Sequence, residues 1–348
     1  MKSRVTLKQV AAQVGVSYQS VSKVLNQKGQ VSKETEERIW QSIHALGYRP
    51  NQIARSLRSQ RSRLIGYSWE PTPSDQVNPI LDQFLQSMSH AAESAGYHLL
   101  TFPHRAWKEA WLGSYRELID TNRVDGFVLS SVEYNDPRIA FLLERKFPFI
   151  AFGRSNPGWD FPFVDIDGGA GMRMVVEHLV DLGHQCIAAL AWPQLSRVGQ
   201  NRLDGYLEAL HASGIPGRND YIARGEGNFR FGWEAANAFL KMDASERPTA
   251  IVAFNDAMAV GAIRALQEHG IPVGREIAVT GFDDTPMVQY LTPPLTSVRQ
   301  PIWEVGQQVM SILLGLLDDR PPIEQHVLLQ PQLIIRQSSD ERAPALDL

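Results

Sequence analysis

The sequence predicts a short all-helical N-terminal domain followed by a larger α/β body of two doubly wound parallel-sheet lobes. Three observations predict this architecture. The first fifty residues space their apolar side chains helically between capping residues, the remainder alternates apolar runs with amphipathic segments, and basic residues gather at the N-terminal end. The 348 residues are enough for two or three domains of ordinary size.

Composition is that of a folded globular protein, with 43% hydrophobic and 21% charged residues. No apolar run approaches the ~18 residues that a membrane helix needs, and the N-terminus lacks an apolar signal core. The single cysteine, Cys186, lies in an apolar run and has no partner for an internal disulfide. We therefore expect Cys186 to be a small core residue and the protein to remain in the cytoplasm.

Charge is unevenly divided along the chain. Residues 1–63 hold five lysines and seven arginines against three glutamates, a net charge of +9, whereas the whole chain carries −4. A basic head on an acidic body favours contact between the head and a polyanion such as nucleic acid. From charge alone, a merely solvated basic face is an open alternative.

The N-terminal segment has the pattern of three short helices. Thr6-Leu7-Lys8-Gln9 has the form of a capping box, Gly15 ends this first helix, and Ser17 can cap a second. Two short helices joined at such a glycine predict a helix-turn-helix. Ser32 can cap a third helix, which carries glutamates in its early turns, where the helix dipole favours acids.

The outward face of the second helix carries hydrogen-bonding side chains, namely Tyr18, Gln19, Ser22, Lys23 and Asn26. Side chains of this kind read base edges in the major groove. A purely structural helix would more often show Glu–Lys pairs on this face. The pattern therefore favours a helix that reads DNA.

The segments TLKQVA (6–11), GVSYQSVSKVLN (15–26), VSKET (31–35) and LGYRPN (46–51) resemble the headpiece of the lactose/galactose repressor (LacI/GalR) family. The resemblance implies that Tyr18, Gln19 and Lys23 read operator bases. Lys23 departs from the usual arginine and reaches guanine as a point charge rather than a fork, so the operator sequence stays open. The full set of expected DNA contacts is Thr6, Ser17, Tyr18, Gln19, Ser20, Ser22, Lys23, Asn26, Ser32, Thr35, Tyr48, Asn51, Ala54, Leu57 and Arg58.

Residues 51–63 follow as a hinge helix or linker, and Asn51 can cap a helix too short to be stable alone. The resemblance implies that this helix forms on operator DNA and that Leu57 wedges between base pairs in the minor groove. A plain basic linker is the alternative, and the Leu57-Arg58 pair favours the hinge.

From residue 64 the sequence alternates apolar runs with amphipathic segments. Predicted strands lie at 64–67, 98–100, 126–129, 149–152, 186–191, 251–254 and 277–279, and predicted helices include 107–121, 171–182, 198–213 and 257–269. Repeated βα units imply parallel sheets covered on both faces, and these strands are too many for one small sheet.

The body also resembles the family, whose effector domain has a two-lobed fold similar to periplasmic sugar-binding proteins. The motifs are VDG (124–126), HL and LGH (178–184), RLDGY (202–206), FNDAMA (254–259), GFDD (281–284) and PLTSV (294–298). The expected domains are the headpiece 1–50, the hinge 51–63 and an effector-binding and dimerisation domain 64–348. Its first lobe covers about 64–161 and 293–320, and its second about 162–292 and 321–340.

Ligands of such folds bind beyond the carboxyl ends of the strands. Carboxylates, amides and arginines at these ends suit vicinal hydroxyls, because each can engage two of them. The resemblance implies effector contacts from Arg202, Asn255 and Asp283, with Phe229 stacking on a sugar face. The full expected set is Glu70, Arg105, Ser130, Arg154, Arg202, Phe229, Asn255, Asp283 and Gln300. Gly153, 69–71 and 104–105 depart from the lactose-type effector pocket of the family, so we expect an effector other than the sugar that this pocket binds.

Other polar residues have structural interpretations. We expect Asp284 to cap the turn that follows it and Asp167 to cap the next helix. His178 and His184 lack an acidic or thiol partner set, so we expect no metal there. No cofactor is expected.

The expected function is a sequence-specific DNA-binding transcriptional regulator, most simply a repressor of carbohydrate-utilisation genes controlled by a sugar-like effector. A purine- or other metabolite-responsive regulator is the nearest alternative, and a cytoplasmic sugar-binding protein a more distant one. An enzyme using Asp283 and Asp284 is disfavoured, because adjacent carboxylates cannot flank one bond and no GxxxxGK[ST] loop occurs. Residues 343–348 are no coiled coil, so we expect a homodimer on a palindromic operator.

Overall fold

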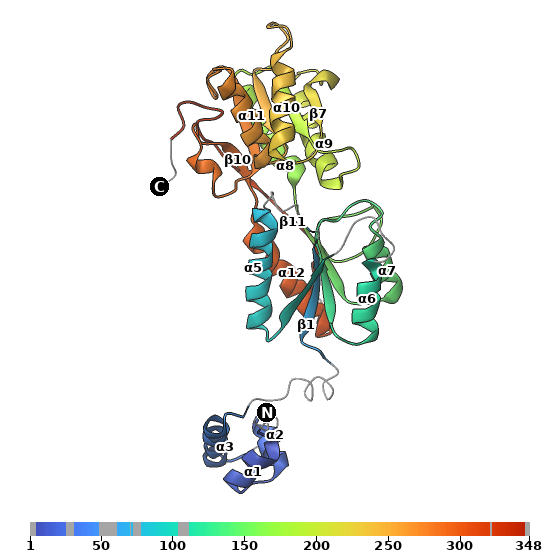
Figure 1. Cartoon of the computed structure of the whole chain (residues 1–348). Coiled ribbons are helices and arrows are strands. Elements are labelled where there is room, and N and C mark those ends of the chain that lie inside the picture. The colour runs from blue at the N-terminus through green and yellow to red at the C-terminus, as the bar shows by residue number, and fades with distance from the viewer. Residues whose placement is uncertain are drawn as a thin grey trace. The chain divides into compact units, whose positions relative to one another are not determined.

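The computed structural model describes residues 5–25, 31–48, 61–69, 71, 78–103, 111–320 and 322–344. The chain divides into two compact units, Met1–Ser62 and Arg63–Leu348, which are described separately (Figure 1). The expected hinge residues Asn51, Ala54, Leu57 and Arg58 lie outside the described residues.

The described part of the first unit holds three helices, α1 (Leu7–Val14), α2 (Tyr18–Leu25) and α3 (Lys33–Leu46). Gly15 and Gly47 end α1 and α3 in the left-handed conformation, which a glycine adopts without steric cost. The apolar stripes of the three helices meet in one core that includes Val10, Val21 and Ile39. The predicted helix-turn-helix and its third helix are therefore confirmed.

The second unit contains two six-stranded sheets. The first has the strand order β11-β5-β4-β3-β1-β2, and its neighbouring strands are all parallel. Its strands are β1 (Leu64–Trp69), β2 (His98–Pro103), β3 (Gly126–Leu129), β4 (Phe149–Phe152), β5 (Phe163–Ile166) and β11 (His326–Leu329).

Helices cover both faces of this first sheet. On one face lie α5 (Pro79–Ser94) and α12 (Ile302–Leu317), and on the other α6 (Trp111–Asp120) and α7 (Pro137–Arg145) (Figure 1). Because successive strand residues point to opposite faces, Val128 of β3 packs with the α5 side while Phe127 and Leu129 pack with the α6 side.

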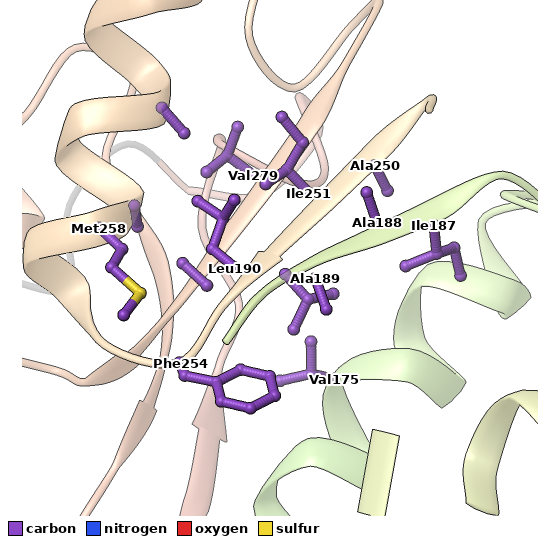
Figure 2. Close-up of a cluster of buried hydrophobic side chains, with 14 of the residues drawn as sticks. Val175, Ile187, Ala188, Ala189, Leu190, Ala250, Ile251, Phe254, Met258 and Val279 are labelled. Atoms are coloured by element: carbon purple, nitrogen blue, oxygen red, sulfur yellow. The ribbon is translucent and has the colours of Figure 1, made fainter. Parts of the chain in front are cut away.

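The second sheet has the order β12-β10-β9-β8-β6-β7 and is parallel except for β12. Its strands are β6 (Ile187–Ala191), β7 (Ile222–Arg224), β8 (Ala250–Ala253), β9 (Ala278–Asp283), β10 (Thr296–Arg299) and β12 (Gln332–Ile334). Its helices are α8 (Gly168–Asp181), α9 (Arg197–Ala212), α10 (Phe229–Leu240) and α11 (Asp256–Glu268). Figure 2 shows Val175 of α8 and Met258 of α11 on opposite sides of the strands.

The chain passes between the two sheets three times, after β5, after β10 and from β11 to β12. The expected lobe bounds were wrong for three strands. The residues of β5 and β11 were expected in the second lobe and lie in the first sheet, and those of β10 were expected in the first lobe and lie in the second sheet. These strands have four residues each, and a short apolar run does not specify which of two buried sheets it joins. Which sheet such a strand joins depends on pairing with strands that are distant in the sequence.

No helix within the described ranges is long and apolar enough to cross a membrane.

Candidate nucleic-acid interface and effector site

Helix α2 has one apolar face in the headpiece core and one polar face exposed to solvent. Val21 and Val24 are buried between α1 and α3, which fixes the rotation of α2 about its axis. Tyr18, Gln19 and Lys23 are consequently exposed, with 49% of Tyr18 accessible to solvent. This is the arrangement that a helix needs to place hydrogen-bonding side chains in a major groove.

Five of the expected DNA contacts stand at the starts of the three helices. The Thr6 hydroxyl takes part in the capping box of α1, and Ser17 Oγ accepts a hydrogen bond from the Ser20 N–H at 3.0 Å. Ser32 Oγ accepts one from the Thr35 N–H at 3.3 Å. These residues therefore hold the helices in place, and their contact with DNA stays a prediction.

Tyr48 lies in the headpiece core with 9% of its surface exposed, so its ring contributes to the packing of the fold, and its contact with DNA stays a prediction. Ser22 is half-buried. The sequence analysis missed Arg38, whose Nη2 donates to the carbonyl of Val14 at 2.7 Å and so joins α3 to the end of α1. Asn26, like the expected hinge contacts, lies outside the described residues.

In the second unit, three expected effector residues meet beyond the ends of β9 and β10. Asp283 Oδ1 accepts a hydrogen bond from Gln300 Nε2 at 2.7 Å and lies 3.7 Å from Arg202 Nη2. Burial raises the pKa of Asp283 to about 6, although Arg202 and Gln300 oppose this rise. Burial also lowers the pKa of Arg202 to about 10, against the effect of Asp283.

Aromatic rings and a carbonyl fix the orientation of the Arg202 guanidinium. It lies 3.5 Å from the ring centre of Phe282 and 4.9 Å from that of Trp192. Nη1 donates to the carbonyl of Phe254. Its Nε–H has no partner among the described groups and is buried. Arg202 is thus held rigidly with one donor still to be satisfied.

Behind this cluster lies a second buried carboxylate, Asp256, the first residue of α11. It accepts hydrogen bonds from Ser297 Oγ at 2.5 Å, from the Thr285 N–H at 2.7 Å and from Thr285 Oγ1 at 2.9 Å. Burial and the neighbouring Asp283 raise the pKa of Asp256 to about 8, although its hydrogen bonds oppose this. Asp256 supports the end of β9 from inside the lobe.

Asn255 holds a loop in place with both ends of its amide. Its Oδ1 accepts a hydrogen bond from the Met258 N–H at 2.9 Å and caps α11, while Nδ2 donates to the Gly227 carbonyl at 2.8 Å. Gly227 belongs to the loop before α10, which begins at Phe229 with 46% of that residue exposed. Both ends of the Asn255 amide therefore form hydrogen bonds within the protein, whereas the Phe229 ring is accessible to solvent.

Arg154 joins a second group, which the sequence analysis found only in part. Its Nε donates to Asp165 Oδ2 at 2.7 Å, and Arg197 Nη1 lies 3.6 Å from the same oxygen. The Arg197 N–H also donates to Glu133 Oε2 at 2.6 Å. Asp165 was missed because β5 was not predicted. Arg197 could have been found by the signal that selected Arg202, a polar side chain near the start of the helix that follows a buried strand.

Ser130 belongs to a polar network inside the first lobe rather than to either group. Only 1% of it is exposed, and its hydroxyl lies 3.0 Å from Tyr67 Oη. Its carbonyl accepts from Arg138 Nη2 at 3.0 Å, and Arg138 is paired with Asp136 at 2.6 Å. The structure thus gives the Ser130 side chain an internal partner. Burial raises the pKa of Tyr67.

The two structural interpretations had different outcomes. Asp167 caps α8 as expected, because its Oδ1 accepts from the Ala170 N–H at 2.8 Å. The interpretation of Asp284 as a turn cap was wrong: its carboxylate pairs with Arg336 and Arg299, each at 2.7 Å. Arginines distant in sequence could not be assigned to it from local spacing.

The remaining expected effector residues, Glu70 and Arg105, lie outside the described residues. His178 and His184 contact Ser339 and Thr249, and no group of metal-ligating side chains occurs in the described part of the chain. Cys186 packs against the core as expected. It also borders a cavity of about 350 Å³ at the opposite end of the second sheet from Asp283.

Two segments of the chain match known families. Residues 6–51 match the lacI family of bacterial regulatory proteins, and residues 176–339 match a periplasmic binding protein-like domain. Among curated relatives, the HTH-type transcriptional repressor PurR of Photorhabdus laumondii is 30% identical over 336 residues, which are 96% of each chain.

Solved structures agree over most of the length. A regulatory protein of the LacI family from Chloroflexus aggregans is 53% identical, with a TM-score of 0.77 over 80% of this chain and 99% of its own. The Lac repressor dimer bound to operator and the anti-inducer ONPF is 30% identical, with a TM-score of 0.84 over 97% and 100%. The complex of the transcriptional regulator CelR with cellobiose is 29% identical, with a TM-score of 0.73 over 96% and 100%.

The capped helix-turn-helix, the two parallel sheets and this similarity over nearly the whole chain lead to one conclusion. The protein belongs to the LacI family of DNA-binding transcriptional regulators, which are not enzymes, and it combines a helix-turn-helix headpiece with a periplasmic-binding-protein-like effector domain.

Proposed function

We propose that this protein represses carbohydrate-utilisation genes and that a sugar-like effector controls its affinity for a palindromic operator, which it binds as a homodimer. The carrying observation is the Arg202–Asp283–Gln300 group beyond the strand ends, in one chain with a DNA-reading helix. The guanidinium, carboxylate and amide together offer paired donors and acceptors, which suit the vicinal hydroxyls of a sugar.

The exposed ring of Phe229 adds an apolar surface on which the C–H face of a sugar can stack. CelR, which has been solved with cellobiose, supports a sugar. PurR is a similarly distant relative and supports the purine alternative, since a purine base can stack on the same ring. The paired hydroxyl-binding groups beside Asp283 favour the sugar.

The proposed mechanism follows from the three passages of the chain between the lobes. An effector held by Arg202 and Asp283 of the second lobe, and by groups of the first, favours one relative position of the two lobes. That position changes how well the dimer presents two headpieces and the segment 51–63 to DNA. The effector can shift operator affinity only by its difference in affinity for the two states.

DNA recognition is tested by selecting bound duplexes from a random library with the full-length protein. We expect enrichment of an inverted repeat whose two halves are separated by a fixed spacing, as a dimer of helix-turn-helix units requires. A library that shows no enriched sequence would refute the DNA part of the proposal.

The effector is tested by thermal shift with mono- and disaccharides, sugar acids, sugar phosphates and purines. A ligand at about 100 times its dissociation constant adds ~2.7 kcal/mol to the free energy of unfolding. Asp283→Ala should abolish the shift while operator affinity stays unchanged, and the exposed Asp243→Ala is the matched control. A response to purines alone would replace the sugar by the purine alternative.

A further inference from the structure

Three arginines at the junction of the two sheets keep donors that are not paired within the described structure. Arg154 Nη2, Arg197 Nε and Arg202 Nε are buried and have no hydrogen-bond partner there. A buried donor without an acceptor costs roughly 1–3 kcal/mol, so such groups normally find a partner. A guanidinium carries donors alone, so the partners of these donors must be acceptors. Arg247 Nε and Arg336 Nε are also buried and unpaired in the described structure, so the gathering of three such arginines, rather than any one of them, distinguishes the junction.

Arg154 and Arg197 also share one negative charge. Both lie against Oδ2 of Asp165, and the other oxygen of Asp165 already accepts from the Ile166 N–H at 2.8 Å. The side chains of Arg197 and Asp165 are only 11% and 10% exposed, so water screens this group weakly. Asp165 therefore divides one carboxylate oxygen between two guanidinium groups, and donors of both arginines stay unpaired.

The start of α9 already holds a carboxylate from the first lobe. The Arg197 N–H is the first of this 16-residue helix and donates to Glu133 Oε2 at 2.6 Å. A helix start and an arginine together favour anions. Glu133 is exposed, and Tyr134 beside it is 43% exposed, so the site opens to solvent on this side.

We propose that the effector carries an anionic group, a carboxylate or a phosphate, which binds Arg154 and Arg197, while its hydroxyls lie against Arg202 and Asp283. The effector is then a sugar acid or a sugar phosphate rather than a neutral sugar. This inference rests on the proposed effector function and specifies its ligand class.

Hydrogen bonding favours this assignment. The groups facing the site are Arg154, Arg197 and Arg202 against Asp165, Glu133 and Asp283, so their formal charges balance and the unpaired donors, rather than the net charge, carry the argument. A hydroxyl placed on each arginine would have to pass its own proton to a further acceptor. An oxyanion accepts several hydrogen bonds and has no proton to place, so it fits a cluster of donors.

The test compares matched sugars at constant ionic strength by thermal shift and isothermal titration of the full-length protein. The sets are glucose, glucuronate, gluconate and glucose 6-phosphate, the same series of galactose, and fructose with its 1- and 6-phosphates. Sodium sulfate and inorganic phosphate serve as plain anions. We expect at least one acid or phosphate to bind roughly 10- to 100-fold more tightly than its neutral partner.

Arg197→Gln should weaken that ligand by a similar factor, Arg197→Lys should restore part of the loss, and the exposed Arg264→Gln should change nothing. Uronates and phosphates in the panel distinguish the two anionic groups. The inference is overturned if a neutral sugar binds as tightly as its anionic partner, or if no anionic sugar binds. It is also overturned if Arg197→Gln binds the anionic sugar as tightly as the wild type does. An equal thermal shift with the plain anions would overturn it too, because it would indicate an adventitious ion only. The duplex-library selection with the same protein tests DNA binding separately. A protein that selects an operator but fails the sugar test would contradict the anionic effector alone.

Discussion

At the residue scale, the end of β9 is held in an unusual backbone conformation. Asp283 and Asp284 have φ angles of 116° and 48°, which cost a residue with a Cβ of order 1–3 kcal/mol each. Gln300 holds the Asp283 side chain and Arg336 that of Asp284, so neighbouring groups maintain the conformation. The strain directs the Asp283 carboxylate to Arg202 before any ligand arrives, which reduces the ordering that binding requires.

The buried carboxylate of Asp256 makes stability depend on pH. Its pKa of about 8 in the folded protein lies above the ordinary value of 3.8, so the folded state retains a proton that the unfolded state has lost. Stability therefore falls as pH rises from about 4 to 8. We expect Asp256→Asn to differ least from the wild type near pH 5 and to melt at an increasingly higher temperature than the wild type as the pH rises to 9.

Melting temperatures measured by calorimetry between pH 5 and 9 check this prediction. Asp243→Asn, an exposed substitution in the same lobe, is the control for changes in net charge. Parallel pH profiles for the wild type and Asp256→Asn would contradict it.

Gln19 is the residue whose loss best tests base reading by α2. Because one base contact contributes about 1–3 kcal/mol of discrimination, Gln19→Ala should accept several bases at one operator position that the wild type restricts to one. Selection from a duplex library measures this preference. Gln41→Ala, an exposed glutamine on α3, should leave the selected sequence unchanged, and an unaltered preference in Gln19→Ala would exclude base reading by this side chain.

Sequence reasoning found Asp283 at a strand end and Arg202 in the helix after a strand, because polar residues beyond parallel strands meet at one sheet edge. Gln300 came from the family resemblance, since β10, the strand before it, was not predicted. It did not foresee that Asn255 and Ser130 would be occupied by internal hydrogen bonds, since these partners depend on tertiary contacts. The sequence pattern shows which side chains could bind a ligand. It does not show which of them the fold has already used.

At the scale of elements, the seven predicted strands are confirmed, and the five that were missed are short. These are β5, β7, β10, β11 and β12, each of three or four residues, and β11 is partly exposed along its length. Each of them contains a polar or charged residue, whereas the predicted strands β3, β4 and β8, which also have four residues each, are apolar runs. Their place in the sheets depends on neighbours from distant parts of the chain.

Helices α10 and α11 pack with their backbones in direct contact. A Cβ on Gly261 of α11 would lie 2.1 Å from the Phe229 carbonyl, and one on Gly232 of α10 would lie 2.1 Å from the Met258 carbonyl. Larger residues at these positions would force the helices apart. The same contact fixes the start of α10, where the Phe229 ring is exposed.

Gly261→Ala should accordingly lower the free energy of unfolding by about 2–3 kcal/mol through overpacking. Urea unfolding followed by tryptophan fluorescence measures the loss. Gly113→Ala on α6 is the matched control, because a Cβ there meets none of the described residues within 4 Å, and it should be neutral or stabilise by about 0.5–1 kcal/mol. Equal effects of the two substitutions would show that the glycine contact has no energetic importance.

At the scale of the whole molecule, sequence patterning predicted the fold class, but the lobe bounds taken from the family resemblance placed the residues of β5, β10 and β11 in the wrong lobes. Because the chain passes between the sheets three times, each sheet combines strands from segments that are distant in the sequence. Arg154 and Asp165 of the first lobe and Arg197 of the second meet there. A ligand on these residues contacts both lobes, which a regulator needs if binding is to change their relative position.

The most direct test of the account measures the affinity of the full-length protein for its selected operator by fluorescence anisotropy, with and without a saturating sugar acid or sugar phosphate found in the panel. The account predicts that the ligand changes the dissociation constant by about tenfold or more, and that operator DNA changes the affinity for the ligand by the same factor and in the same direction. Asp283→Ala should lose this response. Equal operator affinity with and without the saturating ligand would contradict the account.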